Sequence, residues 1–360
     1  MKPTSLGLSG LVLAALCAVG AGAQGPNERV RLPASTHAIA RLAQLRQQAV
    51  AMKLTFTPRI TGVSDTPLAK LTGDQQPSRQ LMAAAPRITA QALRVVAAYN
   101  KLPGVVLATH CTANAATCDY RNLGMVTPIK RQSCGDCWAF ASAAQVESSL
   151  LMAGWSQKDL AEQHILDCSG AGSCGGGTRL TALTWVVGSK GVSDEAGYPY
   201  AGGVQHACKP IASGPGKLIA TGFVNGEWPS VANIKTALAT YGPVSVSIYA
   251  TPLLQSFGGP NGDPNEVFNE QNNGNGTNHA ILIIGWSDAK QAWLIKNSWG
   301  TDWGTKGFGW VHYGSNNIGR NAVWSTAPKF KLTLSPAVLQ EIGKLQVITK
   351  PFLKAAVLPR

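Results

Sequence analysis

The 360-residue chain lacks the sequence features of several functional classes. It contains no Gly-rich phosphate loop and no dinucleotide fingerprint, which argues against the common nucleotide-binding folds. After the N-terminal segment, no apolar run is long enough to cross a membrane. Four histidines, His110, His164, His206 and His312, show no metal-ligand spacing with cysteines or carboxylates, so we expect no metal and no other cofactor.

Acidic residues are scarce toward both ends of the chain, and this scarcity produces the formal net charge of +13. Residues 24–108 carry +8 and residues 329–360 carry +5, whereas residues 109–328 carry −1. No run of Lys and Arg is interleaved with aromatic residues in the manner of a nucleic-acid surface. We therefore expect no nucleic-acid partner.

The N-terminus has the pattern of an export signal. Lys2 supplies a positive charge, residues 6–19 form the apolar stretch, and small residues precede Gln24. We predict a signal peptide over residues 1–23, cleaved near Ala23, and hence a secreted or periplasmic protein without a stable membrane span. The alanine-rich composition of this segment favours a bacterial source.

The most informative stretch is Gln-Ser-Cys-Gly-Asp-Cys-Trp, residues 132–138. The residues after Cys137, up to residue 151, contain no Gly or Pro and are rich in good helix formers, so they predict a helix. A thiol at a helix N-terminus faces unpaired N–H groups and the positive end of the dipole, which lower its pKa. Cys137 is therefore the candidate nucleophile. On this motif alone, a redox or metal-binding pair of Cys134 and Cys137 is the alternative.

Two later segments supply a base and a partner for that base. His279 follows Cys137 by 142 residues and enters an apolar, β-branched run that predicts a buried strand. A second apolar strand ends at Asn297, whose amide oxygen can accept the ring N–H of His279 and fix its tautomer. Trp299 can cover that contact. The pattern predicts a Cys–His–Asn triad.

The chain resembles the papain-like cysteine proteases from about residue 119 to about residue 324. Further matching motifs lie at residues 126–130, 162–168, 174–177, 197–200 and 242–246. The resemblance implies an α+β fold with a helical left lobe and a β-barrel-like right lobe around one cleft. It also implies a monomeric endopeptidase that cleaves proteins or peptides through a thioester acyl-enzyme. The Cys137 N–H and the Gln132 amide would stabilise the oxyanion, although the loop after Gln132 is one residue shorter than in the family.

The cysteine count fits an oxidising compartment. Without Cys17 of the signal peptide and the nucleophile, six cysteines remain. The resemblance implies two disulfides and elimination gives a third: Cys134–Cys174, Cys168–Cys208 and Cys111–Cys118. A further disulfide of the family is absent, because Arg320 stands at one of its cysteine positions.

The resemblance also implies a substrate-binding groove. Gly176 and Gly177 match the segment whose backbone pairs with an extended peptide. The pocket for the second residue upstream of the cleaved bond would involve Thr178, Arg179, Ser247, Thr277 and Ser325, and Asn278 and Trp299 complete the predicted set. Arg179 would favour an acidic side chain if it faces this pocket. The alternative is an arginine that faces solvent.

The chain divides into four predicted parts: a signal peptide (1–23), a propeptide (24–108), a catalytic domain (109–328) and a C-terminal extension (329–360). The propeptide is expected to contain helices over residues 38–53 and 86–102 and to inhibit the enzyme. A separate binding domain or a disordered basic arm is the alternative. We expect the extension to be clipped or surface-bound, with a secretion or docking element as the other possibility.

Two other functions share part of this pattern. The first is a catalytically silent protein of the same fold that binds peptides or a partner, which the intact triad argues against. The second is a peptidoglycan-cleaving thiol hydrolase. Such enzymes usually lack the Asn-Ser-Trp-Gly context of residues 297–300. We therefore predict an endopeptidase made as a zymogen.

Overall fold

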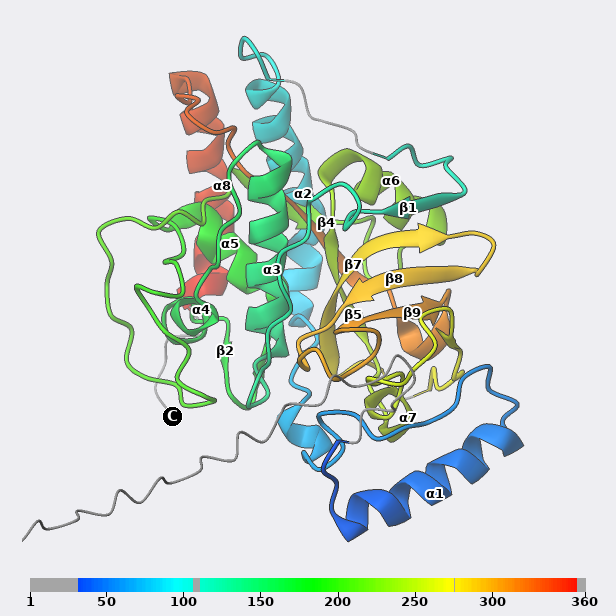
Figure 1. Ribbon diagram of the computed structural model, residues 1–360. Helices are drawn as coiled ribbons and strands as arrows, with labels where there is room; N and C mark the ends of the chain where they lie inside the picture. Colours follow the sequence, from blue (N-terminus) through cyan, green and yellow to red (C-terminus); the bar gives the residue numbers. More distant parts are fainter. Residues whose placement is uncertain (1–31, 106–110, 275, 355–360) are drawn as a thin grey trace, which may run out of the picture. The chain divides into compact units, whose positions relative to one another are not determined.

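Helix α3 (Cys137–Met152) separates a group of helices from a large sheet (Figure 1). The structure is a computed structural model that describes residues 32–105, 111–274 and 276–354. The predicted signal peptide and the predicted propeptide boundary at residue 108 lie outside these residues. Every residue of α3 from Cys137 to Leu150 is buried, including the polar Gln145 and Glu147, so the helix lies in the core. The helix begins at Cys137, as the sequence predicts.

The helical lobe contains two shorter helices beside α3. They are α4 (Glu162–Cys168) and α5 (Arg179–Gly188), and a two-stranded ribbon of β2 (Gly172–Ser173) and β3 (Gly176–Gly177) connects them. The three expected disulfides are all present, namely Cys111–Cys118, Cys134–Cys174 and Cys168–Cys208. Cys137 is the free cysteine among the described residues.

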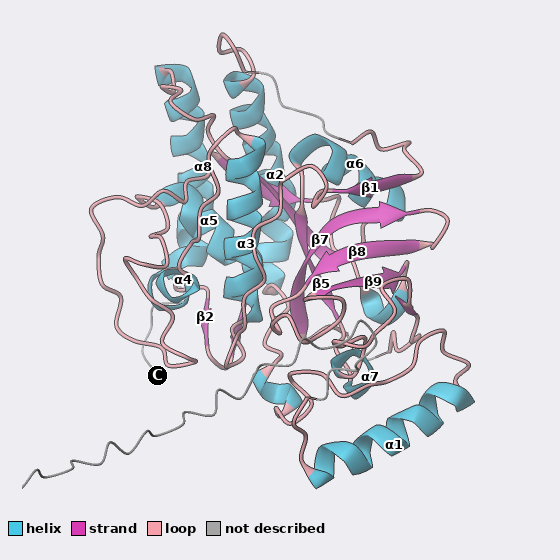
Figure 2. Ribbon diagram, in the orientation of Figure 1, coloured by secondary structure: helices cyan, strands magenta, loops and turns pink. Residues whose placement is uncertain are grey.

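The other lobe is an eight-stranded sheet, which Figure 2 shows beside the helices. Its order is β4 (Ala220–Phe223), β10 (Arg320–Thr326), β5 (Val244–Ile248), β7 (His279–Ser287), β8 (Ala292–Lys296), β9 (Phe308–His312) and β6 (Val267–Phe268). Strand β1 (Thr117–Asp119) also pairs with β7. Helices α6 (Val231–Tyr241) and α7 (Pro252–Gln255) and the 3-10 turn η2 (Ser315–Asn317) connect its strands.

The predicted division into a helical lobe and a strand-rich lobe is confirmed, but the strand-rich lobe, over the residues that the structure describes, does not close into a barrel. Within the described residues the strand order has two ends, β4 and β6, and the sheet is open. Helix α2 (Arg79–Tyr99) packs against β4, and the Thr89 hydroxyl accepts the N–H of Phe223 at 3.0 Å. A helix therefore covers the edge that strand pairing would otherwise close.

Two helices precede the catalytic motifs. Helix α1 (Thr36–Ala51) begins at the Ser35 cap and lies near α7, away from α3. A 3-10 turn, η1 (Leu68–Lys70), follows. Helix α2 follows the Ser78 cap and begins at Arg79, seven residues before the predicted start at Pro86, which lies inside the helix. The early start has a physical cause, because Leu81 and Ala85 extend the buried face of the helix.

The C-terminal extension forms helix α8 (Pro336–Lys354). This helix packs beside α2 and α5 (Figure 1). Gln91 of α2 donates to a carboxylate oxygen of Glu341 at 2.7 Å. No described helix combines the length and apolarity that a membrane crossing requires.

A partly buried charge network joins the two lobes. The Lys130 ammonium lies 2.9 Å from Glu162, 3.3 Å from Glu147 and 2.6 Å from Asp159. Lys296 of β8 donates to the Thr127 hydroxyl at 2.7 Å within the same network. Paired and hydrogen-bonded charges of this kind resist separation, because breaking one pair leaves a buried ion. Glu162 therefore has a structural role in this network.

Candidate active site

Cys137 and His279 approach each other where α3 contacts β7. The thiol is fully buried at the first position of α3, and the imidazole is the first side chain of β7. The backbone N–H of Ala280 faces the sulfur at 3.4 Å, and Cys137 packs against Ala141 and Ala280. The helix start and the strand start thus bring the two groups together from positions far apart in the sequence.

Asn297 holds the ring of His279 in one tautomer. Nε2 of His279 lies 2.8 Å from Oδ1 of Asn297, and the same oxygen accepts the N–H of Ser298 at 2.8 Å. The bond from Ser298 identifies this Asn297 atom as the amide oxygen, which can only accept hydrogen bonds. Nε2 of His279 must therefore carry the proton. The Trp299 indole stacks on the imidazole with centroids 4.6 Å apart. Nδ1 has no hydrogen-bond partner among the described residues, so its lone pair is free to accept a proton.

Burial shifts the pKa values of the thiol and of the imidazole in the directions that favour their neutral forms. Burial raises the pKa of Cys137 far above its usual value, and the carboxylates of Asp74 and Asp136 raise it further. Burial lowers the pKa of His279 to about 4, against the opposing effect of its bond to Asn297. An ion pair between thiolate and imidazolium requires that the covering residues leave.

Gln132 lies beside the nucleophile loop, but its amide has other bonds. Its NH₂ group donates to the Cys134 carbonyl at 2.8 Å, and its oxygen accepts the Ser298 hydroxyl at 2.6 Å. One amide hydrogen is therefore engaged within the shortened loop. The second hydrogen is the one that an oxyanion would need.

A segment preceding α2, residues 71–76, covers the site. Two successive backbone N–H groups, those of Gly73 and Asp74, donate to the Asn278 carbonyl at 2.7 and 2.9 Å. The Gly177 N–H donates to the Gly73 carbonyl at 2.9 Å, and the Gly177 carbonyl accepts the Gln75 N–H at 2.8 Å. The Trp299 indole donates to the Leu71 carbonyl at 3.2 Å. The segment pairs with Gly177 in parallel and occupies the predicted peptide groove.

Glycines permit this close approach. A Cβ at Gly73 would lie 1.9 Å from the carbonyl oxygen of Gly135, next to the nucleophile. A Cβ at Gly176 would lie 2.8 Å from the Gly73 carbonyl oxygen, and Gly176 itself has a φ of +128°. Side chains at these positions would push the segment out of the groove.

The predicted pocket residues do not all lie in one place. Arg179 and Ser247 bond the Asp74 side chain, and Thr277 bonds the side chain of Gln76. Thr178 is the N-cap residue of α5, where its hydroxyl bonds Thr181.

Ser325 does not join this pocket. Its hydroxyl bonds Gln145 and Ser149 on α3, because β10 turns that side chain toward the core. Asn321 takes its place, with a carbonyl that accepts Arg179 at 3.2 Å and an amide that donates to Gln76 at 2.7 Å. Sequence reasoning missed Asn321 and Asp74. The sequence contained a weak signal for Asp74, because it is one of only three acidic residues within residues 24–108.

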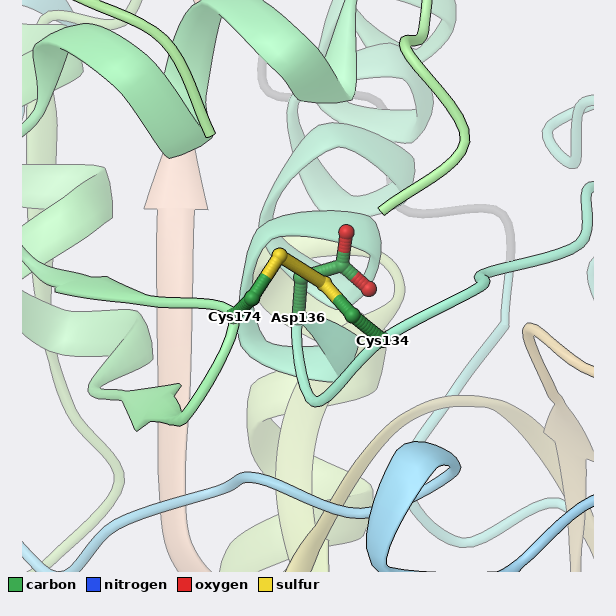
Figure 3. Close-up of side chains that lie close together, drawn as sticks. All are labelled: Cys134, Asp136 and Cys174. Atoms are coloured by element: carbon green, nitrogen blue, oxygen red, sulfur yellow. A yellow bond between two sulfur atoms is a disulfide. The ribbon is translucent and has the colours of Figure 1, made fainter. Parts of the chain in front are cut away.

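Asp136 lies directly before the nucleophile, beside the Cys134–Cys174 disulfide (Figure 3). The three side chains have the proximity of a metal site, but both sulfurs are joined to each other and cannot act as thiolate ligands. The same disulfide removes the alternative of a redox pair between Cys134 and Cys137. Burial raises the pKa of Asp136 to about 6, and the Tyr200 hydroxyl opposes this by donating to the carboxylate.

Comparisons with known proteins agree with this geometry. A family model described as papain family cysteine protease matches residues 114–326. Cathepsin K of Mus musculus is 35% identical over 203 residues, covering 55% of this chain and 60% of that protein. Cathepsin J of Rattus norvegicus is 37% identical over 210 residues with the same coverage, so the chain spans 60% of the length of these relatives. They are animal proteins, and the bacterial origin stays a prediction.

A solved structure supports the fold over a longer part of the chain. Digestive procathepsin L 3 of the Tenebrio molitor larval midgut matches with a TM-score of 0.60 at 23% identity. The match covers 81% of this chain and 89% of that one. At this identity the likeness shows the fold alone. The family match over the catalytic motifs shows more: the chain belongs to the papain family of cysteine proteases.

Proposed function

We propose that the protein is a secreted cysteine endopeptidase made as a zymogen, with Cys137, His279 and Asn297 as its triad. The observation that carries the proposal is the free thiol at the start of α3 beside the strand that His279 begins. The thiol proton passes to Nδ1 of His279, and the thiolate attacks the peptide carbonyl carbon. The imidazolium then protonates the leaving amine, and water hydrolyses the thioester with His279 as base.

The tetrahedral oxyanion would be stabilised by the Cys137 backbone N–H at the helix start and by the Gln132 amide. Removing one such donor costs about 3 kcal/mol of transition-state stabilisation in a comparable enzyme. Because Gln132 also bonds the Cys134 carbonyl, its second amide hydrogen would serve the oxyanion.

Latency would come from the propeptide, residues 24–108, whose segment 71–76 lies in the groove. Three disulfides support an oxidising, extracytoplasmic destination, in line with the predicted signal peptide. Residues 109–328 would form the catalytic domain, and protein or peptide chains would be the substrates.

The test is labelling with an epoxide that alkylates papain-type thiols, followed by peptide mapping. We expect Cys137 to be modified in acid-activated protein and not in the full-length precursor, together with loss of casein cleavage. The Cys137→Ser variant is the matched control, since the six other cysteines of the described chain are in disulfides. An unmodified Cys137 in folded protein without its propeptide would overturn the proposal in favour of a peptide-binding role.

A further inference from the structure

Arg179 is a buried cation at the floor of the peptide groove. Its side chain is 3% exposed, and it begins α5 directly after the groove residues Gly177 and Thr178. A charge removed from water in this way is costly unless it is paired and hydrogen-bonded. Arg179 therefore does not face solvent, and the sequence alternative of a solvent-facing arginine is wrong.

The ionic partner of Arg179 belongs to the covering segment. Nε of Arg179 lies 3.1 Å from Oδ1 of Asp74, and the Ser247 hydroxyl donates to the other carboxylate oxygen. Within the part of the chain that the structure describes, Asp74 is the carboxylate that forms an ion pair with Arg179. Among the described residues that follow the covering segment, no carboxylate forms an ion pair with Arg179.

The remaining contacts would hold the guanidinium where it is. It donates to the Ser247 hydroxyl at 2.6 Å, to the Ser245 hydroxyl at 3.3 Å and to the Asn321 carbonyl at 3.2 Å. These acceptors belong to β5 and β10, not to the covering segment. They are neutral, so they fix the position of the cation and leave its charge unbalanced.

The backbone of Asp74 explains why a substrate side chain can reach the same place. Asp74 lies opposite Gly177, whose N–H donates to the Gly73 carbonyl and whose carbonyl accepts the Gln75 N–H, so the two backbones form a β-like pair. An extended peptide that pairs with Gly177 directs a side chain into the pocket that Asp74 fills.

We propose that Arg179 is a specificity determinant that selects substrates with an acidic side chain in this pocket, and that Asp74 imitates such a side chain in the precursor. The proposal rests on the proposed function, because it names the substrate class of the same site. Small hydroxyl groups surround the guanidinium, and an apolar side chain would leave it unpaired.

The test is a series of fluorogenic peptides that differ only at the second residue upstream of the cleaved bond. Acid-activated natural chain would be assayed with Glu, Gln, Asp, Asn and Leu at that position. We expect kcat/KM for Glu or Asp to exceed that of the corresponding amide by about 30-fold or more, as for the loss of one partner of a buried charge pair. Arg179→Gln should abolish this preference and Arg179→Lys should keep part of it.

Arg320→Gln is the matched control, because Arg320 pairs with Glu227 on the same lobe and should leave the preference unchanged. Titration of Cys137 with the epoxide counts active sites in each sample. Equal rates for acid and amide peptides in enzyme with a titratable Cys137 would overturn the specificity and leave the proposed function intact. If Cys137 does not titrate and no peptide is cleaved, the proposed function fails and the specificity fails with it.

Discussion

The hydroxyl of Tyr200 donates a hydrogen bond of 2.7 Å to Oδ2 of Asp136, while the other oxygen of this carboxylate has no partner among the described residues. Asp136 is fully buried and immediately precedes the nucleophile. One bond to a phenol does not compensate for the loss of hydration, and burial raises the pKa of Asp136 to about 6. The carboxylate is therefore a source of both instability and negative potential beside the thiol.

The Asp136→Asn variant should become more stable than the natural chain as the pH rises. A carboxyl group whose pKa is higher in the folded state contributes full stability below the unfolded value of about 3.8 and loses it as the pH rises through about 6. An asparagine has no such loss, so we expect the variant to match the natural chain near pH 4 and exceed it by about 3 kcal/mol above pH 7. Thermal unfolding at several pH values, in a Cys137→Ser background that prevents self-cleavage, measures the difference.

Asp65→Asn is an informative comparison for that experiment. Asp65 accepts hydrogen bonds from the side chain and the backbone of Ser35, and these lower its pKa. The contribution of Asp65 to stability therefore depends on pH in the opposite direction. It is present above the pKa of the unfolded state and disappears on acidification. If both variants became more stable relative to the natural chain as the pH rises, the pH-dependent loss of stability could not be assigned to Asp136. In active enzyme, Asp136→Asn should also move the acidic limb of the kcat/KM profile to lower pH, because Asp136 raises the pKa of Cys137.

Asn297→Ala tests the positioning of His279. The substitution removes the oxygen that accepts Nε2–H at 2.8 Å and frees the ring to adopt the other tautomer. We expect kcat to fall by about 100-fold with a much smaller change in KM, which is within the range for misplaced acid–base catalysis. Asn297→Asp keeps an acceptor in place and should retain most of the activity, with the alkaline limb of the profile moved upward by the added charge. A purely structural role would instead reduce both variants equally without moving the profile.

The sequence predicted the site better than it predicted what covers the site. Cys137, His279 and Asn297 each lie at the end of an element whose pattern is local: a helix free of Gly and Pro, and two apolar strands. The two strands expected from the apolar runs at His279 and before Asn297 are β7 and β8 of the sheet. Such elements depend mainly on local composition and burial.

Long-range features escaped prediction for a physical reason. The ion pair between Asp74 and Arg179 joins residues 105 positions apart. The local periodicity of apolar residues does not predict which carboxylate pairs with which cation. Helix α8 has an irregular apolar pattern because it is buried by two neighbours, α2 and α5, on different sides. Ser325 was assigned to the pocket by alignment, but β10 has an irregular register between Arg320 and Val323, which an alignment does not reveal, and the Ser325 hydroxyl bonds α3.

Asp74→Asn should weaken latency. The change leaves the Arg179 guanidinium buried without an anion, which costs the covered state a few kcal/mol relative to the open state. We expect the precursor to be labelled by the epoxide at Cys137 and to process itself at a pH closer to neutral than the natural chain. Asp65→Asn, in the same predicted propeptide, should process normally, because Asp65 bonds Ser35. Unchanged processing of Asp74→Asn would show that the backbone bonds of residues 73–75 suffice for inhibition.

Helix α2 should stay with the catalytic body after activation. Its residues Ile88, Ala92 and Val95 are fully buried against β4 and α8, whereas the preceding Gln75, Gln76 and Ser78 are exposed. Cleavage in the exposed stretch releases the groove segment without uncovering the apolar face of α2. We expect size-exclusion chromatography of activated enzyme, followed by denaturing mass spectrometry, to recover residues 79–99 with the catalytic chain. Active enzyme that elutes without this segment would contradict the expectation.

Two leucines on one helix offer a matched test of whether α8 belongs to the folded body. Leu345 is 1% exposed at the contact with α2 and α5, while Leu339 on the same helix is 54% exposed. Leu345→Ala creates a cavity and should lower the free energy of unfolding by about 3 kcal/mol, whereas Leu339→Ala should change it by less than about 0.5 kcal/mol. Chemical denaturation of the full chain in the Cys137→Ser background measures both. Because α8 contacts α2 as well as α5, Leu345→Ala should also hasten processing. Equal stability of the two variants would mean that α8 is a detachable extension, as the sequence first suggested.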